Sequence, residues 1–588
     1  MDIQEIKETS IWTLYEKGRN YHRRTGIYED TDRNYRMYNG DQWGGAKLGD
    51  VEPVQKNFIK PIVKYKVSVI HDNLYAVNYS SQNYENRQFQ KEASRYCDLL
   101  NGYIGRLWEK DKLDYYGRRV TKDAAINGEG IIYVDFDKEE MRPVHEVIKK
   151  VDVYYGNEND DNIQAQPYIL IRKRMPVSNA IEFALNAGMS EKKTEFIIGD
   201  NDNFEESGDA AKYELDNMVT IVYKMYKQNG TVHYSVATRW CDIVEEVDTG
   251  LTNYPIAHFI WEEKEGSARG EGEVKYLIPN QIEVNRTEMR RVLTVKQQAY
   301  PMKVVDVTKV SNPEAIEMVG GVIHTNGQPV EDVHKIVGTI PPAQMSTDVK
   351  QLQEDLIQVT RELAGAGDTA TGQVNPESAS GRAILAVQQA SQAPMTEQKE
   401  AYKNFIEDIA KIDLEYFIVY AEDGVNVQEE VTDQTTGEKY MQMVNVPQSV
   451  LQQLQAVVKI DITPKGVYDR YAMEQTMENF LMQGFFSAQR VQEFEAYVNA
   501  LPDDSVAPKQ DLLEGIENIK RTQQQIAQIN AQAQLMQQRA QQFLMEDPEG
   551  QSSQMADAMM QLQEQQFANQ EAKLDGQVAE EVEQVDKE

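Results

Sequence analysis

The stretch that decides the fold reads Asn375-Pro376-Glu377-Ser378-Ala379-Ser380-Gly381-Arg382-Ala383-Ile384. Ser378 or Ser380 is a typical N-cap residue and predicts that a helix begins here. The helix is expected to run toward Gly424, over about 43 residues or roughly 64 Å, with a kink at Pro394. That length is far beyond an ordinary globular helix. The stretch therefore favours an elongated, mostly helical α+β fold.

The second half of this long helix has a predicted packing face. Apolar and aromatic side chains recur there at helical spacing. They are Tyr402, Phe405, Ile406, Ile409, Ile412, Tyr416 and Val419.

A shorter helix precedes the deciding stretch. Its apolar residues step by three and four and predict one packing seam, formed by Val349, Leu352, Leu356, Val359 and Leu363. Gly365 and Gly367 are expected to end this helix. The loop that follows, 368–375, has no apolar residue larger than valine and no Lys or Arg. Without a cation, the loop is not expected to bind a phosphate backbone tightly. This composition suits a surface that makes only transient contacts.

Another helix of similar length lies upstream, over about 279–298. One of its sides carries Ile278, Ile282, Asn285, Met289, Val292 and Lys296. The glycine-rich segment 266–272 before it predicts a flexible joint. Pro301 is expected to end the helix, and 302–342 contain short strand-like runs. Two helices that bracket a mixed module of about 45 residues predict an antiparallel helical hairpin with a compact module at its tip.

The rest of the chain divides by composition. Residues 1–125 are predicted to be mostly helical, and 130–265 contain the β-branched and aromatic runs typical of strands. Asn229-Gly230 is a hairpin signal within that region. Residues 425–463 contain further strands, and the chain from 464 onward is helical and becomes rich in Gln, Ala and Met. A length of 588 residues predicts three or four folding units, unless copies of an elongated chain share a core.

Charge and cysteine content exclude some classes of protein. The formal net charge is −34, with 61 Lys and Arg against 95 Asp and Glu, so the chain is not expected to grip nucleic acid by neutralising phosphates. An acidic surface can still surround nucleic acid and let it slide; a surface that only keeps the protein soluble is the alternative.

Cys97 and Cys241 are too few for a disulfide framework and fit a reducing compartment. With no signal-peptide pattern and no apolar run of about 18 residues, we expect a soluble protein, intracellular when made, without a membrane partner.

Sequence motifs of known catalytic chemistry are missing. The chain has no phosphate loop, no dinucleotide-binding glycine pattern and no histidines at metal-ligand spacing. The acidic loops 157–161 and 200–209 lack the spacing of an EF-hand calcium site. We therefore predict that the protein is not an enzyme and holds neither a cofactor nor a metal. A metal-dependent nuclease stays an alternative only because acids are abundant.

Four stretches, in order, resemble the portal proteins, the head-tail connectors of tailed bacteriophages. The first two are Tyr35-Arg36-Met37-Tyr38-Asn39-Gly40-Asp41-Gln42-Trp43 and Asn57-Phe58-Ile59-Lys60-Pro61-Ile62-Val63. Leu277-Ile278-Pro279-Asn280-Gln281-Ile282-Glu283-Val284-Asn285-Arg286 resembles the start of the first stem helix, where the family usually has an acid at the position of Asn280. The most specific stretch, Gly372-Gln373-Val374 followed by the ten residues quoted first, resembles the tunnel loop and the start of the long wing helix.

The resemblance implies an elongated α+β subunit of a portal-like ring. Its implied parts are the wing (1–265), the first stem helix (266–300), the clip (301–345), the second stem helix (346–365), the tunnel loop (366–378), the long wing helix and strands (379–463), the helical crown (464–550) and an acidic, Gln-rich C-terminal helix and tail (551–588).

The resemblance also implies a function. Typically twelve copies form a ring at one capsid vertex of the virion, after assembly in the host cytoplasm. Double-stranded DNA passes through the ring during packaging and ejection, without sequence-specific contacts. The implied partners are the terminase large subunit, then the head-tail adaptor, the major capsid protein and, as a further candidate, a scaffold protein.

Two sets of site residues follow. Transient hydrogen bonds to passing phosphates are expected from Thr369, Thr371, Gln373 and Asn375, although an ordinary connection between helices is the alternative for this loop. Packing of the stem helices is expected from Ile282, Met289, Val292, Val349, Leu352, Leu356 and Val359.

A second class of function stays open. The Gln-rich C-terminal region is also typical of a coiled-coil scaffold or adaptor of the virion that has no channel. Within a portal, the same region has two possible roles, a helical barrel inside the capsid or a scaffold-binding segment. The strand-bearing middle of the chain favours the portal over the scaffold.

Overall fold

The computed structural model describes residues 8–44, 52–81, 87–200, 217–300, 302–327, 336–341, 344–346, 348–367, 393–432, 439–454 and 456–464, with isolated positions between 498 and 535. The chain divides into two compact units, 1–463 and 464–588, and nearly all described residues belong to the first. Helices and strands are mixed in that unit, so the fold is α+β, as predicted. None of the helices in the described ranges is both long enough and apolar enough to cross a bilayer.

The N-terminal part is mostly helical, as predicted. Its elements are α1 (Ser10–Thr25), α2 (Ile27–Asn39), α3 (Ile59–Ile70), β1 (Asn73–Ser81), α4 (Arg87–Lys110) and α5 (Leu113–Asn127). Thr9 caps α1, because its hydroxyl accepts a hydrogen bond from the amide of Trp12. Gly26 separates α1 from α2 with a left-handed φ of 75°, and Gly128 ends α5 with a φ of 102°.

Two antiparallel sheets follow, with strand orders β3-β2-β9 and β4-β5-β6-β7-β8. Their strands are β2 (Glu129–Asp137), β3 (Arg142–Ile148), β4 (Val153–Tyr155), β5 (Ile169–Pro176), β6 (Met218–Gln228), β7 (Thr231–Ala237), β8 (Asp242–Asp248) and β9 (Ile256–Ile260). Between β5 and β6 the chain forms α6 (Val177–Asn186) and α7 (Glu191–Thr194). The predicted hairpin at Asn229-Gly230 is confirmed, because both residues have positive φ and join β6 to β7.

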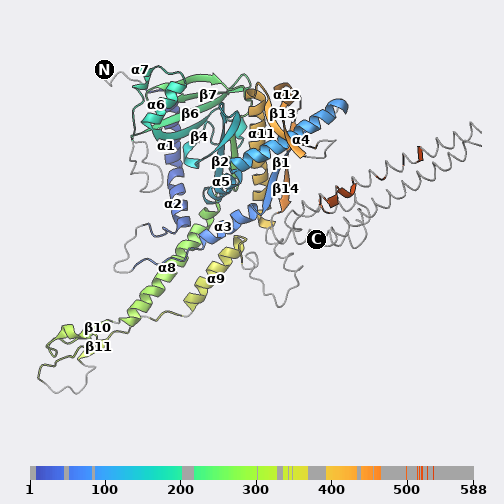
Figure 1. The fold of residues 1–588 in the computed structure, drawn as a ribbon. Helices are drawn as coiled ribbons and strands as arrows, with labels where there is room; N and C mark the ends of the chain where they lie inside the picture. The colour runs from blue at the N-terminus through green and yellow to red at the C-terminus, as the bar shows by residue number, and fades with distance from the viewer. Residues whose placement is uncertain are drawn as a thin grey trace, which may run out of the picture. The chain divides into compact units, whose positions relative to one another are not determined.

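The central core forms along α11 (Thr396–Tyr420), which lies beside the sheets in Figure 1. Its predicted apolar stripe is confirmed. Six of the seven predicted side chains are buried, namely Tyr402, Phe405, Ile406, Ile409, Ile412 and Tyr416, and Val419 is partly buried against the same core. Phe405 also packs against Phe259 of β9, which joins the helix to the three-stranded sheet.

The predicted kink at Pro394 stays a prediction, because the chain before Ala393 lies outside the described residues; Pro394 itself lies in a 3-10 turn, Ala393–Met395, that precedes α11. The helix ends at Tyr420, shortly before Gly424, whose φ of 79° places it in the turn before the next strand. The predicted start at Ser378 or Ser380 lies outside the described residues.

After α11 come β12 (Val425–Thr432), β13 (Lys439–Val446), α12 (Gln448–Leu454) and β14 (Ala456–Pro464), and β14 pairs with β1.

Two further helices form an antiparallel pair, α8 (Glu273–Ala299) and α9 (Asp348–Leu363), which lie side by side in Figure 1. Between them in the chain, β10 (Lys303–Val305) pairs with β11 (Val337–Thr339), and this small sheet lies at the end of the pair that is farther from the large sheets. A 3-10 turn, Pro313–Ile316, belongs to the same tip.

A buried histidine connects α11 to the three-stranded sheet. His145 of β3 contacts Asp413 of α11, with 3.1 Å between Nε2 and Oδ1, and both side chains are fully buried. Asp111 lies 3.6 Å from the other ring nitrogen, and Trp108 donates a hydrogen bond to the second oxygen of Asp413. Burial alone would lower the pKa of His145, but the two carboxylates raise it to about 9. His145 is therefore charged at neutral pH.

This charge makes stability depend on pH. The folded pKa of His145 is raised, so its contribution is fully present below pH 6.5 and is lost as the pH rises toward 9. We expect the free energy of unfolding to fall by about 3 kcal/mol between about pH 6.5 and pH 9.5, and most of that fall to disappear in His145→Asn. Urea denaturation at both pH values measures the difference. His324→Asn, at an exposed position of the tip, is the control; an equal fall in the native and His145→Asn chains would contradict the assignment.

Candidate functional site

The segment that leads into α8 is buried rather than loose. Arg269 is 5% exposed, and the backbone around it packs against the end of α5. A Cβ at Gly270 would lie 2.5 Å from the carbonyl oxygen of Gly128, and a Cβ at Gly272 would lie 2.6 Å from that of Ile126. These glycines permit close approach of two backbones. The predicted flexible joint at 266–272 is therefore wrong.

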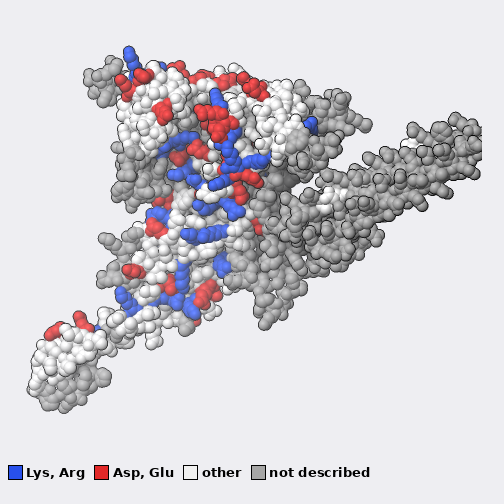
Figure 2. Space-filling view, in the orientation of Figure 1, with Lys and Arg blue, Asp and Glu red and all other residues white. Residues whose placement is uncertain are grey.

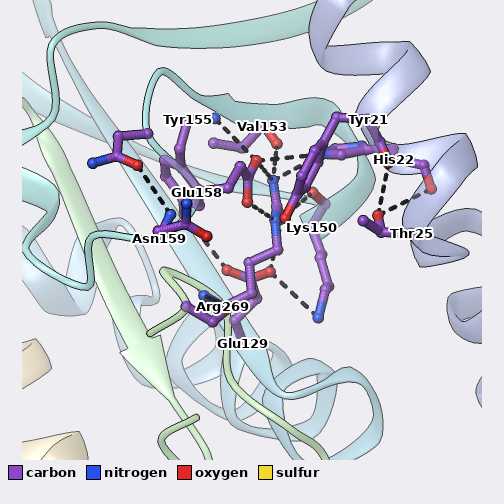
Figure 3. A network of polar contacts seen from close by, with 12 residues as sticks. Tyr21, His22, Thr25, Glu129, Lys150, Val153, Tyr155, Glu158, Asn159 and Arg269 are labelled. Atoms are coloured by element: carbon purple, nitrogen blue, oxygen red, sulfur yellow. Dashed lines mark hydrogen bonds and ion pairs between the residues drawn. The ribbon is translucent and has the colours of Figure 1, made fainter. Parts of the chain in front are cut away.

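Arg269 is the centre of a buried polar network, shown in Figure 3. Its Nη1 donates to Glu129 at 2.9 Å, and its Nε donates to Glu158 at 2.7 Å. Its Nη2 donates to the second oxygen of Glu158 and to the carbonyl of Val153, and lies 2.9 Å from Nε2 of His22. One side chain thus joins α1, the start of β2 and the loop after β4 to the root of α8.

Further groups complete the charge balance of the network. The ammonium of Lys150 lies 3.4 Å from Glu129, and Nε2 of His258 lies 2.8 Å from the other oxygen of that carboxylate. The guanidinium of Arg269 lies over the ring of Tyr155, 4.9 Å from its centroid. Two cations therefore face two buried carboxylates, which is the condition for keeping charges away from water.

The network sets the protonation of its members. Burial alone would raise the pKa of Glu158, but Arg269 lowers it to about 2. Burial also acts against ionisation of Glu129, yet Arg269 and Lys150 hold its pKa well below the usual range. Burial and the neighbouring Arg269 lower the pKa of His22 to about 4, so its neutral imidazole accepts a hydrogen bond from the guanidinium.

Three of the stretches that carry the resemblance meet at α8. The side chain of Gln281, which is fully buried, accepts a hydrogen bond from the amide of Phe58 at 3.0 Å and donates to the carbonyl of Lys56 at 2.8 Å. One turn later, Asn285 accepts from the amide of Lys56 and donates to the side chain of Gln42. The segment before α3 is therefore bonded along α8.

The contact between α8 and α9 is largely polar. Asn280 donates to Thr360 at 2.9 Å. Gln353 donates to the carbonyl of Val284 at 3.3 Å and accepts from Arg291 at 2.9 Å. Gln353 and Thr360 are only 2% and 3% exposed. Because a shift of one helix along the other would leave these buried groups without partners, the contact specifies one register.

The predicted packing residues are unevenly buried. Met289 is buried, whereas Ile282, Val292, Val349 and Leu356 are half-buried. Two others are turned to solvent, with Leu352 65% exposed and Val359 49% exposed. Their packing against a neighbouring chain stays a prediction. The loop residues Thr369, Thr371, Gln373 and Asn375 lie outside the described residues.

Sequence patterns missed Gln353, Thr360 and Arg269. A heptad pattern assigns packing to apolar positions, and Gln353 and Thr360 each follow such a position by one residue. One signal was present, since these two polar residues are seven apart and so share a face of the helix. Nothing in the glycine-rich surroundings of Arg269 indicates a buried cation.

Replacing the central cation tests the network. Arg269→Met should lower the free energy of unfolding by about 3–5 kcal/mol, because Glu129 and Glu158 would stay buried without it. Arg286→Met removes an exposed arginine of α8 and should change stability by less than about 0.5 kcal/mol. Chemical denaturation of both variants measures the effect, and losses of similar size would contradict a special role for Arg269.

Comparisons with known proteins identify the family of the chain. No curated protein matches the sequence. Among solved structures, a chain from the "Neck of empty GTA particle computed with C6 symmetry" is 9% identical with a TM-score of 0.34, and the match covers 75% of this chain and 89% of that one. So low a TM-score carries no argument by itself. A family model described as phage P22-like portal protein matches residues 171–573, which is well over half of the sequence and includes both helices of the hairpin. The chain belongs to the phage P22-like portal protein family.

Proposed function

We propose that this chain is a portal subunit, whose copies form a ring-shaped DNA channel at one capsid vertex of the virion. Genomic DNA would be packaged and ejected through that channel. Family membership supports the proposal. The observation that carries it is an apolar face of α9 that the described part of the chain leaves uncovered. We call this face the α9 seam and define it as Leu352, Val359 and Leu363, which are 65%, 49% and 82% exposed.

The α9 seam fits contact with a second copy of the chain. A side of α9 about 90° around the helix from the seam already meets α8 through Gln353 and Thr360, so the seam is not needed for that contact. Burying a leucine or valine side chain contributes about 1.5–3 kcal/mol, so an uncovered row of three favours association. A contact between two different faces, repeated from copy to copy, closes into a ring when the rotation between copies allows it.

The exposed surface of α8 suits a channel wall. Glu283 lies 3.8 Å from Arg286 and 3.4 Å from Arg290, and all three side chains are about half exposed or more. The two arginines share one acidic neighbour, so this part of α8 keeps an excess of only about one positive charge. The net charge of −34 supports a channel in which DNA slides rather than binds.

The tip of the hairpin fits a docking role. Its exposed apolar side chains include Met302, Val307, Met318 and Val319, at 71%, 66%, 65% and 108% exposure. Apolar side chains gathered on a small module mark a site of protein contact. We therefore assign to 302–342 the docking of the terminase large subunit during packaging and of the head-tail adaptor afterwards. The major capsid protein and, during assembly, a scaffold protein complete the proposed partners.

Charges placed in the α9 seam should prevent assembly. Native mass spectrometry with negative-stain imaging is expected to show rings of the native chain near twelve copies, roughly 800 kDa for subunits of 67.3 kDa, with an axial hole wide enough for a ~20 Å duplex. Leu352→Asp/Val359→Asp should remain monomeric, because a ring would bury two unpaired carboxylates per subunit.

Leu185→Asp/Val247→Asp is the matched control, since it charges two exposed apolar side chains of α6 and β8. This control should still form rings. Rings of equal abundance in the α9 variant would remove the seam from the interface. A closed dimer or a filament without a hole, formed by the native chain, would favour the scaffold function instead.

Removal of the tip module tests the docking assignment. A chain in which a short Gly-Ser linker replaces 302–342 should keep its wing folded, because the central core contains no residue of that module. We expect it to abolish DNA packaging in an assay with terminase and empty capsid precursors. Normal packaging by this variant would refute docking at the tip.

A further inference from the structure

A cavity of about 480 Å³ lies beside the root of α8, and nothing in the proposed ring function uses it. Residues of α2, α5 and the turn after β3 line the cavity, among them Tyr35, Arg36, Arg119, Lys122, Asn127 and Lys149. Its volume falls in the range of small-ligand sites, about 300–1,000 Å³. Lys150 and Glu129, which belong to the Arg269 network, also contribute to its wall.

The cavity concentrates cations in a strongly acidic protein. Figure 2 shows that Lys and Arg are frequent in the middle and lower part of the face shown, where Asp and Glu lie among them, whereas the upper rim is mostly Asp and Glu. Arg36 is paired with Asp32 and Asp41, which more than balance its charge. Lys150 is likewise paired with Glu129.

Three other cations of the cavity are left over. Arg119, Lys122 and Lys149 form no ion pair with the carboxylates of the described ranges. These three cations act on the carboxylate of Asp123. That carboxylate already accepts a hydrogen bond from the hydroxyl of Tyr35 at 2.7 Å. Burial raises the pKa of Asp123, although the three cations act to lower it. The cavity lining as a whole holds five cations and four acids, an excess of one positive charge, and the three unpaired cations are the groups free to meet an anionic ligand.

A buried amide in the wall also lacks a partner. Asn127 is 7% exposed, and its Oδ1 has no hydrogen-bond partner in the described part of the chain. An asparagine amide offers one acceptor and two donors, and rotation by 180° exchanges them. A buried polar group without a partner destabilises the protein unless a ligand or water supplies one. The amide can therefore serve a bound oxyanion or a hydroxyl carried by the same ligand.

We propose that this cavity is a binding site for the phosphate group of a ligand, held by Arg119, Lys122 and Lys149. The fork of the Arg119 guanidinium suits two oxygens of one phosphate, while the two ammonium groups supply point charges. The phosphate group can come from a small phosphorylated molecule or from a DNA backbone, and these sources differ in size rather than in the chemistry of recognition. The site does not depend on the proposed ring.

Titration of the full chain with pyrophosphate tests the site. Isothermal titration calorimetry at low salt should show saturable binding of one pyrophosphate per chain. Arg119→Gln/Lys149→Gln should weaken that binding at least about tenfold, because it removes two of the three charges. Both side chains are exposed, so the fold should be retained, and circular dichroism checks this. Lys122→Gln serves as a second variant on the same helix as Arg119.

The matched control is Arg118→Gln/Lys64→Gln. Arg118 is the neighbour of Arg119 in α5, is also exposed and is paired with Asp114 outside the cavity, and Lys64 is an exposed lysine of α3. Unchanged binding by the control with weakened binding by the cavity variants would support the site.

A second titration distinguishes the two sources of phosphate. A short DNA duplex that binds more tightly than pyrophosphate, and loses binding in the same cavity variants, would identify the DNA backbone as the ligand. Pyrophosphate binding without duplex binding would identify a small phosphorylated molecule. If neither probe binds, or if the cavity and control variants lose binding equally, the proposal is overturned.

Discussion

The structure depends on one buried cation. Arg269 lies between Glu129 and Glu158, and each of these carboxylates comes from a different part of the β-rich region. The guanidinium also donates to a backbone carbonyl and to a neutral histidine of α1. Each of its three nitrogens therefore has at least one hydrogen-bond acceptor. A buried pair of this kind gives little net stability compared with apolar residues, but removing one partner is strongly unfavourable. Its consequence is positional, because it fixes where the chain leaves the sheets and α8 begins.

From that fixed start, buried polar contacts join the two helices of the hairpin, while the α9 seam stays exposed in the described part of the chain. Gln353 and Thr360 join α9 to α8, and Gln281 and Asn285 join α8 to the segment before α3. Hydrogen bonds between buried groups depend strongly on direction, whereas apolar contacts do not. The hydrogen bonds therefore define the register of the two helices better than apolar contacts would. The apolar face of α9 then remains available for another chain. Polar contacts within the chain and an exposed apolar face on α9 support a subunit whose internal shape is set before it assembles.

Electrostatics differ between the two surfaces that concern phosphates. On α8, Arg286 and Arg290 share Glu283 as a close acidic neighbour. In the cavity, Arg119 and Lys149 have no such partner, although the chain as a whole carries −34. Net charge therefore describes how the whole protein meets a polyanion, while local pairing decides whether one site can hold a phosphate.

The sequence by itself determined features whose causes are local. The Asn229-Gly230 hairpin, the apolar stripe of α11, the mixed α+β class and the family resemblance were all readable from neighbouring residues. Spacing along a helix shows which residues share a face, but it does not show which neighbour that face meets. Only the tertiary structure decided that Gln353 rather than Leu352 faces α8, and that Gly270 and Gly272 permit close packing of two backbones. The same holds for Arg269, because its partners lie more than a hundred residues away in the chain and no local periodicity encodes such a pairing.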